Sequence, residues 1–283
     1  DFRVIHGYVE RKDRLQEFRG SKYVQSEIRE AFQKARDFLE AGRSVLFTGT
    51  PCQIAGLKAF LRKPFDNLFT VDIVCHGVPS PGVWQRYIAF REKHAGSKTR
   101  RIAFRRKDEG WKLYSLSFLF QNGKEYRQSF KDDLYMTAFL RNICLRLSCY
   151  NCEYKSLHRQ SDTTLADFWG IQNILPEMDD DKGTSLIIIN SAQGREMFEK
   201  VKSTIDCKEV DIEQALGYNS AALKSAKYTL KREKFFRDLD RLPFDQLVKR
   251  CSSDTFIVKI KRKLKLIIRI TLKKICFLTG VEQ

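Results

Sequence analysis

The chain has 283 residues, of which 42% are hydrophobic and 31% are charged. These values are ordinary for a globular protein with one large or two small domains, and they exclude a mostly disordered chain. The formal net charge of +17 fits a solvated basic surface or an acidic partner, such as an acidic electron carrier, a polyanionic cofactor, a membrane surface or nucleic acid. No apolar run approaches the roughly 18 residues that a membrane-spanning helix needs, so we expect a cytoplasmic protein.

The first part of the chain alternates helices and strands. Residues 2–8 have the pattern of a strand interior, which suggests that the chain is part of a longer protein. Helical spacing of apolar residues follows over 27–41, then an apolar strand over 44–48, a helix over 53–61 and a second strand over 68–74. This order predicts a parallel sheet that is covered by helices.

The middle of the chain has the pattern of an antiparallel section. Residues 101–106, 111–120 and 124–130 are expected strands, and Asn122-Gly123 marks a tight hairpin between the last two. A helix is expected over 133–145.

The last part of the chain adds strands to the first sheet and then becomes basic and helical. A strand with a polar exit is expected over 161–170, a strongly apolar strand over 185–189 and a helix near 195–202. Basic helices are expected beyond residue 230. We therefore predict a mixed α/β (α+β) fold with a catalytic domain over 1–230 and a basic helical extension over 231–283.

Four cysteines suggest a metal or iron–sulfur site. Cys149-x-x-Cys152 lets two thiolates reach one centre, but the pair alone suits zinc, an iron–sulfur cluster or a redox dithiol. Cys52 and Cys75 each follow an expected strand, and the loops at the carboxyl ends of parallel strands form the ligand crevice of such sheets. Four thiolates suit a 4Fe–4S cluster, and a structural zinc ion in a protein without redox function is the alternative.

The other cysteines are expected to be structural. Cys144 forms a ferredoxin-like spacing with Cys149 and Cys152, and it could replace one of the other ligands. Because it falls in an expected helix, we favour a small buried side chain. Cys207, Cys251 and Cys276 have apolar or basic surroundings.

Six segments resemble those of the coenzyme F420 hydrogenase/dehydrogenase beta subunit family. They are 18–26 (FRGSKYVQS), 47–57 (FTGTPCQIAGL), 71–80 (VDIVCHGVPS), 148–152 (SCYNC), 159–162 (RQSD) and 167–170 (DFWG). The resemblance runs from about residue 10 to about residue 230.

The resemblance implies a non-covalent FAD, a 4Fe–4S cluster and electron transfer to an organic hydride acceptor such as a deazaflavin coenzyme. The cluster ligands it implies are Cys52, Cys75, Cys149 and Cys152. The flavin contacts it implies are Arg19, Gly20, Ser21, Lys22, Tyr23, Ser26, Thr48, Gly49, Thr50, Gln53 and Asp167. His76, beside Cys75, is the expected catalytic proton donor, with an ordinary loop histidine as the alternative reading. Apart from the resemblance, Arg159 could pair with Asp162 or with a phosphate, and we expect an ordinary surface ion pair with Asp162.

Two expectations concern partners. Many relatives carry a ferredoxin-like module that this sequence does not contain, so we expect ferredoxin or a separate ferredoxin-like module as the electron donor. Nucleic acid is not expected as a partner, because the aromatic residues fall at core spacing and no binding fingerprint is present. In the basic tail, Ile257, Ile260, Leu264 and Ile267 share a helical face, which fits a peripheral membrane contact at the inner face, a docking helix or packing onto the chain itself.

Overall fold

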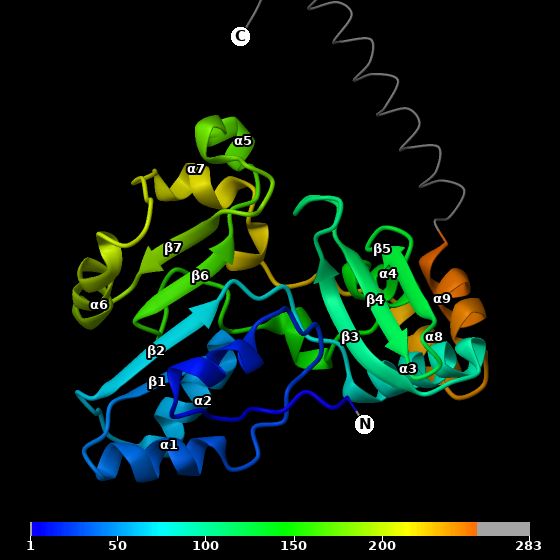
Figure 1. Cartoon of the computed structure of the whole chain (residues 1–283), viewed down its shortest axis with the longest axis horizontal. Helices are drawn as coiled ribbons and strands as arrows, with labels where there is room; N and C mark the ends of the chain where they lie inside the picture. Colours follow the sequence, from blue (N-terminus) through cyan, green and yellow to red (C-terminus); the bar gives the residue numbers. More distant parts are fainter. Residues whose placement is uncertain (1, 254–283) are drawn as a thin grey trace, which may run out of the picture.

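The computed structural model describes residues 2–253, which form two β-sheets that lie side by side (Figure 1). The larger sheet has the strand order β1-β2-β6-β7, and the smaller has the order β3-β4-β5. The strands are β1 Val45–Gly49, β2 Leu68–Ile73, β3 Thr99–Arg106, β4 Ser115–Phe120, β5 Glu125–Ser129, β6 Thr163–Asp167 and β7 Ser185–Ile189. The mixed α/β fold predicted from the sequence is confirmed.

Helices flank both sheets. The α-helices are α1 Ala31–Glu40, α2 Pro51–Leu61, α3 Pro81–Ala95, α4 Leu134–Leu140, α5 Ile171–Ile174, α6 Ala192–Lys202, α7 Ile212–Gly217, α8 Lys231–Asp238 and α9 Phe244–Ser252. The 3-10 helices are η1 Lys12–Phe18, η2 Leu147–Asn151, η3 Pro176–Met178 and η4 Ser220–Ala222.

The larger sheet is mainly parallel. β1 pairs with β2, and β2 with β6, in parallel, whereas β7 runs antiparallel to β6. The pairs Gly49–Asp72 and Asp72–Thr164 keep the three parallel strands in step. Their carboxyl ends therefore meet at one edge of the sheet, which the arrowheads of β2 and β6 mark in Figure 1.

The smaller sheet contains the predicted hairpin. Gly123 has φ 81°, a conformation that glycine adopts without strain, and Phe120 donates its N–H to the Lys124 carbonyl at 2.9 Å. The expected strand over 111–120 is shorter at its start. Trp111 donates its N–H to the Asp181 carbonyl at 2.7 Å instead of pairing with a strand, so β4 begins only at Ser115.

Two other expected elements differ from the structure. The helix expected over 133–145 begins where predicted, because Asp133 caps it by accepting the Met136 N–H at 2.9 Å, but it ends at Leu140. Asn142 has φ 59°, which a continuing helix does not allow. Residues 2–8 form no strand and make only an isolated bridge between Ile5 and Glu27.

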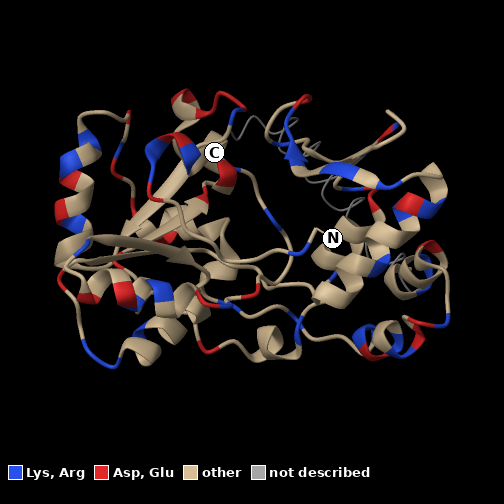
Figure 2. Cartoon of the chain, turned by 60° about the horizontal axis from the view of Figure 1, so that its bottom comes forward, with Lys and Arg blue, Asp and Glu red and all other residues tan. Residues whose placement is uncertain are grey.

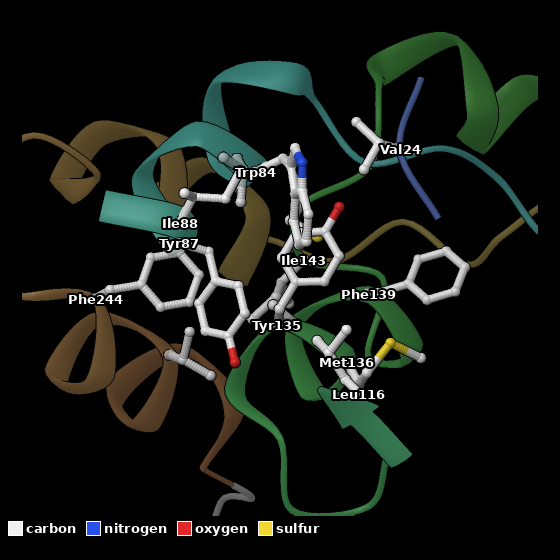
Figure 3. Packing of buried hydrophobic residues seen from close by; sticks show 14 of the residues in the cluster. Val24, Trp84, Tyr87, Ile88, Leu116, Tyr135, Met136, Phe139, Ile143 and Phe244 are labelled. Carbon is white, nitrogen blue, oxygen red and sulfur yellow. The ribbon is translucent and has the colours of Figure 1, made fainter. Parts of the chain in front are cut away.

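The largest core cluster lies between the smaller sheet and its helices (Figure 3). Trp84 and Tyr87 of α3 pack against Tyr135 of α4, with ring centroids 4.9 and 5.5 Å from that ring. Phe244 of α9 lies 5.1 Å from Tyr87, and Phe235 of α8 is fully buried in the same cluster. Residues 231–252 thus share a core with the smaller sheet, and the domain boundary expected at residue 230 stays a prediction.

No helix within residues 2–253 is long and apolar enough to cross a membrane. The residues on which the membrane or docking prediction for the tail depends, and Cys276, lie outside the described part of the chain.

Candidate functional site

The carboxyl edge of the parallel strands carries two of the four predicted ligands. Cys52 lies in the first turn of α2, directly after β1, and Cys75 follows the end of β2 by two residues. The local sequence explains the position of Cys52. Pro51 occupies the first turn of α2, and Thr50 and Gln53 form a reciprocal capping box that starts the helix there.

The Cys149–Cys152 segment reaches this edge through a short antiparallel contact. Ser80 donates its N–H to the Cys144 carbonyl at 3.1 Å, and Arg146 donates to the Val78 carbonyl at 2.9 Å. These bonds align the chain before η2 with the chain that follows Cys75. Two segments that are about 70 residues apart along the sequence are thereby fixed side by side.

Gly77 allows the two segments to approach closely. A Cβ atom at this position would lie 2.9 Å from Leu145 Cδ1 and 3.3 Å from Cys149 Cβ. Its φ of +146° also disfavours any residue with a side chain. The glycine beside Cys75 and His76 is therefore a condition for bringing Cys149 to the sheet edge.

The electrostatics of the thiols place all four in one neighbourhood. Burial raises the pKa of Cys75 to about 11, and the negative charges of Cys149 and Cys52 act in the same direction. Burial also raises the pKa of Cys149, and the charges of Cys152 and Cys52 add to that effect. These mutual effects indicate that the four cysteines, from three separate segments, are neighbours, and their role as one ligand set stays a prediction.

The four thiols do not form a site for a single ion in this conformation. Among residues 2–253, no three His, Cys, Asp or Glu side chains lie close enough together to ligate one metal ion. Thiolates that share one zinc ion, each about 2.3 Å from it, must lie within about 4 Å of one another.

Cys144 behaves as the buried residue that the sequence analysis favoured. Its side chain is 0% exposed within the core around the smaller sheet, beside Tyr135. Burial raises its pKa well above the ordinary value of a thiol. Cys251 is likewise buried, whereas Cys207 is exposed.

Lys155 is a site residue that the sequence analysis missed. Its ammonium group donates to the carbonyl oxygens of Cys75 and, at 2.8 Å, of Ala221. Burial lowers the pKa of Lys155, while the negative charges of Cys75 and Cys152 raise it. Its position three residues after Cys152 was the only sequence signal, and a lysine there is ordinarily read as a surface residue.

Part of the predicted flavin loop is joined to the cysteine site by hydrogen bonds. Gln53 donates its side-chain N–H to Ser26 Oγ at 2.8 Å and accepts the Thr50 N–H at 2.9 Å. Thr50 Oγ1 lies 3.1 Å from Cys52 Sγ. Ser26, Thr50 and Gln53 therefore lie beside Cys52, although Ser26 and Thr50 are far apart along the sequence.

The remaining flavin residues occupy the surrounding loop and strand. The Lys22 ammonium donates to the carbonyl oxygens of Phe18 and Gly20, at 3.2 and 3.1 Å. The Tyr23 ring stacks on Phe139 with a centroid distance of 5.2 Å. The others lie in the chain that follows η1 or at the end of β1: Arg19, Gly20, Ser21, Thr48 and Gly49.

Asp167 lies at the end of β6, where it links the two sheets. Its carboxylate accepts a hydrogen bond from Arg105 of β3 at 2.5 Å, and the Arg105 side chain is only 9% exposed. Beside this pair the rings of Trp111 and Trp169 stack with centroids 4.3 Å apart. The structure gives Asp167 an ion pair with the smaller sheet, and its predicted flavin contact stays a prediction.

His76 is held in place by its neighbours. Its Nε2 lies 2.6 Å from Asn142 Oδ1, and its ring meets Phe139 edge-on at 5.1 Å. Burial lowers the pKa of His76, the Asn142 hydrogen bond raises it and the Lys155 charge lowers it. The neutral imidazole is therefore the favoured form, and the catalytic role expected for His76 stays a prediction.

Arg159 differs from the expected surface pair with Asp162. It lies 3.7 Å from Asp72 of β2, and both side chains are buried. Asp162 instead accepts hydrogen bonds from Thr70 N–H at 2.8 Å and from Ser191 Oγ at 2.7 Å. The prediction was wrong because the fold carries the chain after Cys152 into the interior, where Asp72 offers a carboxylate to the guanidinium.

A comparison with curated proteins finds no match. A comparison with family models matches residues 42–215, which is more than half of the chain and includes all four cysteines of the site. The matching model describes the C terminus of the beta subunit of coenzyme F420 hydrogenase/dehydrogenase, and the chain belongs to this family of oxidoreductase subunits.

Proposed function

We propose that this chain is an iron–sulfur flavoprotein that passes electrons between a 4Fe–4S cluster, FAD and an organic hydride acceptor such as a deazaflavin coenzyme. One observation carries the proposal. Thiols from three separate segments, Cys52, Cys75 and the Cys149–Cys152 pair, act electrostatically on one another, and the first two follow parallel strands at their carboxyl ends. That edge is where open α/β sheets bind their ligands.

The chemistry of the four cysteines suits an iron–sulfur cluster, because such clusters are held by four thiolates. The thiols of Cys149, Cys152 and Cys52 also act on one another electrostatically. Backbone N–H groups around Gly77 and at the start of α2 would be available to a cluster's sulfides. The four cysteines would act as ligands, and the chain's part is to hold them apart at the corners of the cluster.

The flavin would lie beside the same edge. FAD supplies the conversion between single electrons and a hydride. Ser26, Thr50 and Gln53 form a polar group next to Cys52, and Lys22 adds a cation in the preceding loop. These residues would bind and orient the cofactor, because hydroxyl, amide and ammonium donors match phosphate oxygens and the ring edge.

His76 would hold a proton near the reacting groups. Its neutral form carries one N–H, and the contact with Asn142 fixes the ring orientation. The Phe139 ring contacts both His76 and Tyr23 and shields that side of the imidazole from water. A positioned, neutral imidazole can donate or accept a proton near neutral pH.

The electron donor is proposed from charge and chemistry. The net charge of +17 favours encounter with an acidic ferredoxin or ferredoxin-like module. Figure 2 shows lysines and arginines on elements of both sheets, interspersed with acidic residues. The acceptor is a small molecule, and nucleic acid and the membrane have no part in the proposed reaction.

Anaerobic purification followed by iron, sulfide and flavin analysis tests the proposal. We expect a brown protein with about four irons and four sulfides per chain and FAD that is released on denaturation. Replacing Cys75 or Cys149 by Ser should remove most of the iron, whereas the matched control Cys207→Ser should keep it, because Cys207 is exposed and does not act on the site thiols. A protein that binds zinc and gives no visible band would support a structural metal without redox function.

A further inference from the structure

Lys155 is a half-buried cation without a carboxylate partner among residues 2–253. Its ammonium group donates to two backbone carbonyls, those of Cys75 and Ala221. Within residues 2–253, no Asp or Glu forms an ion pair with it. Removing a charge from water costs several kcal/mol, so buried charges in proteins are normally paired.

Arg159, four residues further along, is a direct comparison. It enters the interior on the same segment, donates to the Ala222 carbonyl at 3.3 Å and lies 3.7 Å from Asp72. The two cations thus have the same kind of backbone contact, but only Arg159 has a carboxylate. The difference indicates that the counter-charge of Lys155 comes from another source.

The groups that act on Lys155 as acids are the cysteines of the site, and they carry negative charge only when they are deprotonated. Cys75, Cys152 and Cys149 all act electrostatically on its ammonium group. Cysteines that ligate metal are deprotonated, so as cluster ligands these residues would supply the negative charge that no carboxylate among residues 2–253 provides. Arg146 also acts on Cys149, but its side chain is exposed and water screens its charge.

We propose that Lys155 is the counter-ion of the cysteine-ligated centre and raises its reduction potential. This inference rests on the proposed function. A fixed ammonium beside the cysteines would favour the more negative, reduced state of a cluster held there, after it accepts one electron from the donor, over the oxidised state. The bonds to Cys75 and Ala221 hold the ammonium between the end of β2 and η4, so it is a positioning and tuning residue rather than a ligand.

Anaerobic potentiometric titration of the full chain with dithionite and redox mediators, followed by electron paramagnetic resonance, tests the role of the charge. The variants are Lys155→Met and Lys155→Gln, which remove it, and Lys155→Arg, which keeps it. We expect the first two to lower the ratio of reduced to oxidised centre about tenfold at a fixed potential, equivalent to a midpoint about 59 mV more negative for one electron. Lys155→Arg should restore the wild-type midpoint to within a third of that shift.

The matched control is Lys58→Met. Lys58 also donates to a backbone carbonyl, that of Gln160 at 2.5 Å, but it is exposed and does not act on the thiols. Its midpoint should equal that of wild type. Equal midpoints in all variants would overturn the inference. A Lys155→Gln variant with the wild-type midpoint, beside a Lys155→Met variant with a lower one, would also overturn it. In that case a hydrogen bond from residue 155, without a charge, would be sufficient to set the midpoint.

Loss of the cluster would also be informative. If Lys155→Met and Lys155→Gln lose iron while Lys155→Arg keeps it, and the metal-free melting temperatures agree, the charge stabilises the centre and the inference stands. Lower metal-free melting temperatures in all three variants would mean a purely structural role and overturn it. Wild-type protein without iron would contradict both the proposed function and the inference. Iron-loaded variants with equal midpoints would contradict the inference alone.

Discussion

Arg159 and Asp72 form an ion pair in the interior of the larger sheet, at 3.7 Å and with side chains only 3% and 1% exposed. The pair joins the segment that follows Cys152 to the strand that leads to Cys75. Burial raises the pKa of Asp72, and the Arg159 charge lowers it. The arginine therefore offsets part of the cost of burying this carboxyl group.

Replacing Arg159 by Met should strongly destabilise the chain, because it leaves a buried carboxylate without its partner. We expect a loss of about 3–5 kcal/mol in the free energy of unfolding, measured by urea denaturation of the metal-free protein. The double variant Arg159→Met/Asp72→Asn should recover part of the loss, since it removes the unpaired charge. A single variant within about 1 kcal/mol of wild type would mean that the pair contributes little.

Replacing Gly77 by Ala should separate the two cysteine segments. The new methyl group would meet Leu145 Cδ1 at 2.9 Å, and the φ of +146° adds backbone strain. We expect a loss of about 1–3 kcal/mol together with a lower iron content after reconstitution. Gly7→Ala is the control, because nothing lies within 4 Å of a Cβ atom there and its φ is ordinary. Equal iron content in both variants would show that the close approach at Gly77 is unnecessary.

Gln53 should be needed for flavin retention, because it joins Ser26 to Thr50 at the start of α2. Gln53→Ala frees both partners, and we expect about tenfold weaker FAD binding, close to the effect of losing a net hydrogen bond of about 1.4 kcal/mol. Fluorescence titration of the flavin-free chain measures the affinity.

The control for Gln53→Ala is Gln33→Ala. Gln33 lies on α1 and donates to Asp37 at 2.6 Å in an exposed contact, so its loss should leave the affinity unchanged. Unchanged affinity in Gln53→Ala as well would remove this residue from the proposed flavin site without affecting the cysteine prediction.

Local sequence patterns were sufficient to predict the elements whose formation depends on neighbouring residues. The apolar run of β7, Ser185–Ile189, was predicted with the bounds that the structure gives. The hairpin at Asn122-Gly123 depends on one glycine with positive φ, and it was also predicted. The positions of Cys52 and Cys75 followed from the rule that parallel strands end at one edge.

The features that the sequence analysis missed depend on contacts between residues distant in sequence, except for helix α3. Lys155 and Arg159 look like surface cations until the fold places them against Cys75 and Asp72. The helix α3 was missed although its signals are local. Pro81 starts it, Gly96 ends it with φ 63°, and Trp84, Tyr87 and Ile88 form its buried face. Those aromatic residues gave no indication of which sheet they cover.

His6 should give the chain a pH-dependent stability that is independent of the cysteines. Its ring stacks on Phe47 of β1 at 5.6 Å, and burial lowers its pKa, against a raising effect of the Thr48 backbone. Since the folded state disfavours the imidazolium, the neutral His6 ring makes its full contribution to the free energy of unfolding above the unfolded pKa of about 6.5. This contribution is lost as the pH falls from that value toward the lower pKa of His6 in the folded state.

The variant His6→Phe keeps a ring against Phe47 but cannot bind a proton. Between about pH 7 and pH 5, the free energy of unfolding of wild type should therefore fall more steeply than that of the variant, and the difference between the two curves isolates His6 from the carboxylates that titrate in both. His94→Phe is the control, because that ring lies exposed near the end of α3. Parallel curves for wild type and His6→Phe would mean that the imidazole is hydrated in both forms and that its burial beside β1 has no energetic consequence.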